Sequence, residues 1–155
     1  MRVLLAASAL ICALAVPVLA DDKSEWGTYE SPDEMRLFYG VPDSGNVTIS
    51  FACEPKRKRI GIVTAVLPRK PRRGQQLRTT LRNGALAATY AGKLGYTESE
   101  GYYFHMYTAL DPKVVEVLKS GTSFTIGTPG TQERVPLNGA AEHVAKFEAA
   151  CFGKH

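Results

Sequence analysis

Apolar and polar side chains alternate with a period of two along several short stretches of this chain. In residues 46–51, Val47, Ile49 and Phe51 are separated by polar side chains, which is the pattern of a half-buried β-strand. Further strands are expected at 34–39, 60–67, 77–82, 85–90, 102–109, 123–127 and 133–137. The segment 60–67 is apolar on both faces, as in a central strand that is covered on each side.

Turn and cap residues complete the expected secondary structure. Asn83-Gly84 supplies the positive-φ residues of a tight hairpin turn between 77–82 and 85–90. A short helix should follow Asp111 as N-cap, with Pro112 in the first helical position and Gly121 after its end. Asn138 can cap a last helix near the C-terminus. We therefore expect a mainly β, antiparallel fold, sandwich-like or barrel-like, with two short helices, the last of them C-terminal.

Residues 1–20 have the layout of a cleavable secretory signal peptide. Arg2 precedes an apolar run over 3–16, and small or β-branched residues lead to Ala20. The run is shorter than the about 20 residues that a membrane-spanning helix needs, and no later segment approaches that length. We expect cleavage before Asp21, a single β-rich domain over 21–155, a periplasmic or secreted location, and no transmembrane segment after signal cleavage.

Cleavage would also remove Cys12 and leave two cysteines, Cys53 and Cys151, in a compartment that permits oxidation. Cys53 continues the buried face of its strand, and Cys151 lies on the apolar face of the last helix. A disulfide between them would fix that helix to the sheet and close a loop of roughly 100 residues. The alternative is two buried free thiols. The helix face shared by Cys151 also contains Ala140, Val144 and Phe147, and Glu142 and Lys146 can pair on its exposed side.

Positive charge is concentrated in the middle of the chain. Residues 54–82 contain ten basic residues and one acidic residue, whereas residues 21–50 contain two basic and seven acidic residues. The candidate anion-binding side chains are Lys56, Arg57, Lys58 and Arg59, then Arg69, Lys70, Arg72 and Arg73, and finally Arg78 and Arg82. The first two clusters flank the 60–67 segment, and an eight-residue strand rises roughly 26 Å, so they should lie at opposite ends of it. The alternative interpretation is a solvated surface that keeps the protein soluble.

Residues suited to catalysis are sparse. His105, between Tyr103 and Tyr107 on one face of a strand, could act as a general base or metal ligand, although a packed surface histidine is the alternative. His143 and His155 lack the carboxylate or cysteine spacing of a metal site. The chain contains no nucleophile motif, phosphate-binding glycine loop or Cys-x-x-Cys pair. We therefore expect no cofactor and no metal, and we favour a binding protein over an enzyme.

The C-terminal third carries a family resemblance. Leu118-Lys119-Ser120-Gly121 ends a short helix, and a strand, the segment Val-Pro-Leu-Asn-Gly at 135–139 and an Ala-rich helix follow. This arrangement resembles the invasion-associated locus B family of secreted bacterial proteins, and Trp26 looks like the opening tryptophan of that family. The resemblance implies a β-rich periplasmic or secreted domain, associated in pathogens with host-cell entry, and it carries over no catalytic residues.

The leading hypothesis is an exported, non-enzymatic binding protein of the bacterial envelope. Its basic segment would contact an anionic envelope component or a host surface. Nucleic acid is not the expected partner, because the basic segment lacks the interleaved aromatic residues of a single-strand binding platform. Two other classes stay open. One is an enzyme or enzyme inhibitor acting on envelope polymers, with Tyr103, His105 and Tyr107 as its site, and the other is a structural periplasmic protein without a dedicated ligand. The oligomeric state also stays open.

Overall fold

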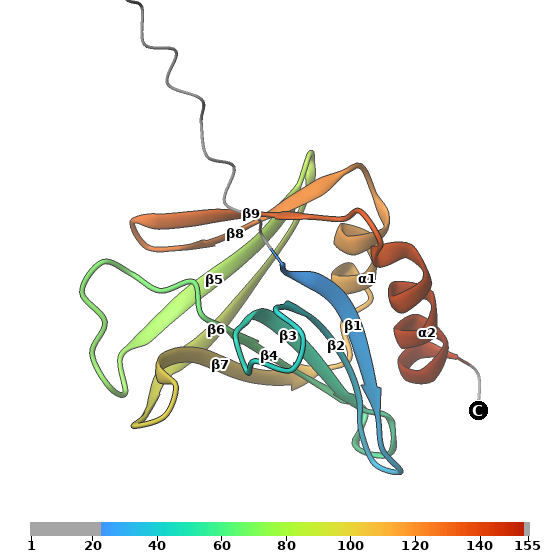
Figure 1. The fold of residues 1–155 in the computed structure, drawn as a ribbon, viewed down its shortest axis with the longest axis horizontal. Helices are drawn as coiled ribbons and strands as arrows, with labels where there is room; N and C mark the ends of the chain where they lie inside the picture. Colours follow the sequence, from blue (N-terminus) through green and yellow to red (C-terminus); the bar gives the residue numbers. More distant parts are fainter. Residues whose placement is uncertain (1–22, 154–155) are drawn as a thin grey trace, which may run out of the picture.

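A computed structural model describes residues 23–153, and the predicted signal peptide lies outside the described residues. The chain forms one nine-stranded antiparallel sheet in the order β1-β2-β3-β4-β7-β6-β5-β8-β9, with two helices at one side (Figure 1). The strands are β1 (Glu25–Glu30), β2 (Met35–Gly40), β3 (Val47–Glu54), β4 (Arg59–Thr64), β5 (Gln76–Asn83), β6 (Leu86–Thr97), β7 (Gly101–Ala109), β8 (Ser123–Thr128) and β9 (Thr131–Pro136). The helices are α1 (Lys113–Lys119) and α2 (Ala140–Phe152), and a 3-10 turn, η1 (Pro55–Arg57), joins β3 to β4.

The sheet curls until its first strand meets its last two. The ring of Trp26 on β1 lies 6.3 Å from the ring of Phe124 on β8, and its indole Nε1 donates a 2.8 Å hydrogen bond to the main-chain oxygen of Pro136 on β9. The fold is therefore a single barrel-like sheet. The expected mainly β, antiparallel class with a C-terminal helix is confirmed, and its barrel-like form is the one observed.

The inner face of the curled sheet holds the hydrophobic core. Its strands contribute fully buried Leu37, Ile49, Phe51 and Ile62, and α1 and α2 complete the core. On α2 the predicted apolar face is confirmed, because Ala140, Val144, Phe147 and Cys151 are all buried. The predicted pair on its exposed side is also present, with Lys146 Nζ 2.7 Å from Glu142 Oε1. Neither helix within residues 23–153 has the length and apolar composition that a bilayer crossing requires.

The predicted disulfide is confirmed. Cys53 on β3 and Cys151 on α2 are bonded, with their Cα atoms 6.0 Å apart and 98 residues of sequence separation. Both residues are buried. The bond therefore fixes the last turn of the C-terminal helix to the end of β3.

Two strand predictions need correction. The segment predicted as a strand at 60–67 forms β4 only to Thr64, and only its inner face is covered, because Val63 is 37% exposed on the opposite face. The strand predicted at 85–90 is longer than expected, because β6 begins at Leu86 and ends at Thr97. Two glycines in that extension lie under aromatic rings of β7: Gly92 under Phe104 and Gly95 under Tyr103.

Two turn predictions also need correction. Asn83 pairs with Leu86, so Gly84, with φ +58°, is in the turn but Asn83 is the last residue of β5. The Asn83 side chain instead donates hydrogen bonds to two main-chain oxygens at the end of α1, those of Val117 and Ser120. The α2 helix has Gly139, rather than Asn138, at its N-cap position, with no side-chain cap. The fold thus closes α1 with a side chain from a distant hairpin.

The start of α1 lies one residue later than predicted: Pro112, not Asp111, is at the N-cap position, and Lys113, not Pro112, is the first helical residue. The Asp111 carboxylate accepts a 3.0 Å hydrogen bond from the main-chain nitrogen of Lys113, the first helical residue. Its other oxygen accepts a 2.9 Å hydrogen bond from the Tyr90 hydroxyl. Burial, together with this contact to the carboxylate, raises the pKa of Tyr90. Asp111 therefore precedes the N-cap, binds the first residue of the helix and joins the helix to β6.

Candidate functional site

The outer face of the sheet, opposite the core and helices, carries an unusual pairing of glycine and aromatic residues. Gly27 pairs with Phe38, Gly61 with Tyr107, and Gly95 with Tyr103 across neighbouring strands. A Cβ atom placed on any of these glycines would come within 2.7 Å of the opposing ring. The three aromatic rings therefore lie across their neighbouring strands, each over a glycine.

A broad groove of about 930 Å³ occupies this outer face over β1 to β4 and β7. Small side chains of β3 and β4 are among the residues that line it, including Ser50, Ala52 and Gly61. The most exposed rings in its lining are Tyr29 on β1, 58% exposed, and Tyr107 on β7, 62% exposed. Phe38 and Tyr103 also line it, and Asp43 and Glu100 contribute carboxylates from the hairpins β2–β3 and β6–β7. We call this surface the aromatic groove.

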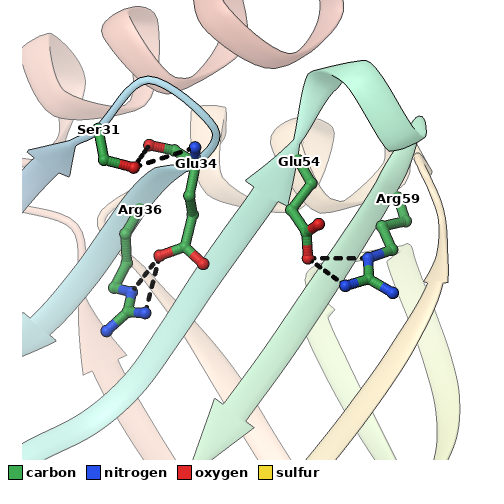
Figure 2. Close-up of polar contacts among 5 residues, drawn as sticks. All are labelled: Ser31, Glu34, Arg36, Glu54 and Arg59. Atoms are coloured by element: carbon green, nitrogen blue, oxygen red, sulfur yellow. Dashed lines mark hydrogen bonds and ion pairs between the residues drawn. The ribbon is translucent and has the colours of Figure 1, made fainter.

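Ion pairs hold the strand ends beside the groove (Figure 2). Arg36 donates to Glu34 Oε1 through Nε at 3.0 Å and through a terminal nitrogen at 2.7 Å. Ser31 and the main chain of Glu34 hydrogen-bond to each other at 3.2 and 3.3 Å, which closes the β1–β2 turn. Arg59 Nε donates to Glu54 Oε1 at 2.8 Å. Each of these guanidinium groups therefore has a carboxylate partner within its own sheet region.

The first basic cluster of the sequence is largely neutralised. Lys56 forms a 2.8 Å ion pair with Asp33, and both Arg57 and Arg59 contact Glu54. The hydrogen bond from Arg59 lowers the pKa of the Glu54 carboxyl, and the one from Lys56 lowers the pKa of the Asp33 carboxyl. The guanidinium of Arg59 also lies 5.1 Å from the centre of the Tyr107 ring. These cations stabilise the β3–β4 end of the sheet, and only Lys58 of this cluster lacks an ion pair among residues 23–153.

The second basic cluster lies at the other end of β4, in the loop that leads to β5. All four of its cations are exposed, and no ion pair within residues 23–153 involves them. The loop closes beside β6, because Gly74 donates to the main-chain oxygen of Leu94 and Leu94 donates to that of Gln75. Figure 1 shows this loop on the side of the molecule away from the helices. We call Arg69, Lys70, Arg72 and Arg73 the basic loop.

The outer face of β6, β5, β8 and β9 continues the positive charge of the basic loop. Arg78 pairs with Ala91 and Lys93 with Gln76, so these two cations are diagonal neighbours, roughly 7 Å apart along the sheet. Arg82 and Arg134 both pair with Thr125 of β8, one from each side. All four cations are exposed. We call Arg78, Arg82, Lys93 and Arg134 the cationic face.

Negative charge is sparse in this half of the described structure, where Glu133 on the edge strand β9 is the one exposed carboxylate of β5, β6, β8 and β9 within residues 23–153. By the strand register, the outward positions of β5, β6, β8 and β9 within residues 23–153 hold no aspartate or glutamate. Between the cations lie Thr, Ala, Gly, Ser and Gln side chains. The lysines and arginines that form ion pairs with carboxylates elsewhere within residues 23–153 do not include the four cations of the cationic face. This surface therefore carries a net positive charge.

His105 lies where the two halves of the outer face meet. It pairs with Val63 of β4 on one side and with Lys93 of β6 on the other, and its ring is 5.6 Å from that of Tyr103. Partial burial and, to a lesser degree, the neighbouring Lys93 lower the pKa of His105. The histidine is thus held toward its neutral form. Within residues 23–153, no group of three or more His, Cys, Asp or Glu side chains is arranged to hold a metal ion.

The basic residues are grouped differently in the structure than along the sequence. Arg78 and Arg82 lie on the outer face of β5, the strand that follows the basic loop, whereas Lys56, Arg57 and Arg59 form ion pairs elsewhere. Sequence reasoning missed Lys93 and Arg134, which lie outside the basic segment. The alternating patterns around them would have placed both on outward positions. It also missed the strand β1. In that strand Trp26, Thr28 and Glu30 lie on one face, and the side chains between them lie on the other.

Comparison of the chain with protein-family models, with curated proteins and with solved structures found no match. The resemblance of residues 110–152 to the invasion-associated locus B family stays a prediction.

Proposed function

We propose that this chain is an exported, non-enzymatic binding protein whose cationic face and basic loop bind an anionic polymer or surface. The observation that carries the proposal is the excess of positive charge: eight exposed cations, in the basic loop and on β5, β6 and β9, against one exposed carboxylate, Glu133, on β5, β6, β8 and β9 within the described residues. Such a surface attracts phosphate, sulfate or carboxylate groups and concentrates them locally. The expected signal peptide and the Cys53–Cys151 bond are compatible with export.

The register favours an extended ligand over a single small anion. Arg78 and Arg82 are four residues apart on β5, which corresponds to roughly 13 Å along the strand. Arg134 lies two strands from Arg82, which adds roughly 10 Å across the sheet. Cations this far apart cannot converge on one anionic group, but they can each meet one group of a repeating polymer or of an anionic surface.

The test compares two neutralised pairs in the chain 21–155. Arg78→Gln with Arg82→Gln removes two charges from the cationic face, and Lys56→Gln with Arg57→Gln removes two charges from the paired cluster. Binding to dextran sulfate and to lipopolysaccharide is measured by fluorescence anisotropy across a salt series. We expect the first pair to weaken binding at least tenfold at near-physiological salt and to reduce the salt dependence, with less than twofold change for the second. Equal weakening by both pairs would contradict the proposal, because it would indicate attraction to net charge alone.

A further inference from the structure

We propose that the aromatic groove is a sugar-binding subsite, so that the ligand of the cationic face is an anionic polysaccharide. This inference rests on the proposed function and names its ligand class. The groove and the cationic face share the outer side of one sheet and adjoin at the register pair of His105 and Lys93. A single extended chain can therefore occupy both.

The groove offers the two kinds of contact that a sugar ring needs. A sugar ring presents an apolar C–H face, which packs against an aromatic ring, and hydroxyl groups at its edge, which hydrogen-bond. Tyr29 and Tyr107 line the groove from strands on opposite sides of β2, β3 and β4, and both rings are more than half exposed. The small side chains of Ser50 and Ala52, with Gly61, leave room between them. Aromatic rings of this kind contribute large contact area with little loss of rotamer entropy.

Tyr107 is held in place before any ligand arrives. Its ring lies across Gly61 on one side, where a Cβ atom would come within 2.7 Å of it. On another side the guanidinium of Arg59 lies 5.1 Å from the ring centre, and that guanidinium is itself fixed by Glu54. A ring positioned in this way loses little freedom on binding, which favours affinity.

The charge of the groove favours a sugar over a nucleic acid strand. Asp43 and Glu100 contribute carboxylates to its lining, and the charge of Arg36 is paired with Glu34. Carboxylates accept hydrogen bonds from sugar hydroxyls but repel phosphates, which a nucleic acid carries at every nucleotide. The uncharged part of a glycan therefore fits the groove, and its sulfate, phosphate or carboxylate groups fit the cationic face.

The experiment uses the chain 21–155 and three probes of similar length: dextran sulfate of low sulfate content, which carries unsulfated sugar units as well as charge, polyphosphate, which carries charge alone, and oligo(dT). The groove variant is Tyr29→Ala with Tyr107→Ala. The conservative variant, Tyr29→Phe with Tyr107→Phe, keeps both rings. Leu86→Ala is the control, because Leu86 is 37% exposed and does not line the groove.

We expect the groove variant to bind dextran sulfate about tenfold more weakly and polyphosphate unchanged. The phenylalanine variant and the control should bind both probes within about twofold of the wild type. Unchanged dextran sulfate binding in the groove variant would overturn the sugar subsite. Preferential binding of oligo(dT) that the groove variant weakens would also overturn it, in favour of nucleic acid.

The failure of the underlying proposal gives a different result. Arg78→Gln with Arg82→Gln should weaken dextran sulfate and polyphosphate alike if the cationic face binds anions. If that pair changes neither probe, the cationic face is not the anion site, whatever the tyrosine variants do. The two variants therefore report separately on the two halves of the outer face.

Discussion

Loss of the disulfide should destabilise the protein by an amount that follows from its position in the chain. The bond between Cys53 and Cys151 closes a loop of 98 residues. The chain-entropy relation assigns to such a loop about 4.7 kcal/mol of stabilisation at 25 °C. Unfolding of the 131 residues from 23 to 153 has an entropy of roughly 0.28 kcal/mol/K, so this loss corresponds to a fall in Tm of about 17 °C.

Thermal unfolding of the chain 21–155, followed by circular dichroism with and without dithiothreitol, measures this effect. The variant Cys53→Ala with Cys151→Ala serves as the control, because its Tm should resemble that of the reduced wild type and should not respond to dithiothreitol. A wild-type shift below about 4 °C, or about 1 kcal/mol, would refute the reasoning. It would mean that the packing of α2 alone holds the last helix in place and that the bond adds nothing to it.

Two further predictions concern single side chains. Because the pKa of His105 is lowered in the folded protein, the unfolded chain binds that proton more tightly, and the free energy of unfolding should rise with pH until about pH 6.5. Lys93→Gln should make this rise shallower in urea titrations at pH 5 and pH 7, and an unchanged slope would show that Lys93 does not act on the histidine. Asn83→Ala should cost about 1 to 3 kcal/mol, because it removes hydrogen bonds to two carbonyl groups at the end of α1. Asn138 was predicted to cap α2 but does not do so, and Asn138→Ala should therefore change the free energy of unfolding in urea by less than about 0.5 kcal/mol. Equal losses in the Asn83 and Asn138 variants would contradict the role of Asn83 at the end of α1.

Local patterns were enough to predict most elements of the fold. The alternation in β3, the helical apolar face of α2 and the pairing of its cysteine with Cys53 were all readable from the sequence, because each depends on a period or on redox chemistry. The length of β6 was not predicted, because this strand was expected to end at residue 90. Its continuation contains Gly92 and Gly95, which make room for rings of β7. That room depends on the neighbouring strand, which a local pattern does not contain.

The candidate site was harder to predict because it depends on strand order. Arg78 and Lys93 become neighbours only when β5 pairs with β6. Lys56 and Asp33 are 23 residues apart in the chain, so their ion pair could not be read from a local charge run. The sequence therefore indicated how much positive charge the segment carries, whereas the structure determines which of those charges are paired.

The contact between the first strand and the end of the chain has a consequence for the order of folding. Trp26 hydrogen-bonds to Pro136, and α2 packs against β1 and β2, so residues far along the sequence cover part of the inner face of these strands. Contacts of such large sequence separation make folding slow. While the chain emerges N-terminus first, from a ribosome or a membrane channel, the apolar side of β1–β3 stays open until α2 arrives. Packing of α2 is thus the last step of folding. A chain that ends before residue 140 keeps the apolar side of β1–β3 exposed.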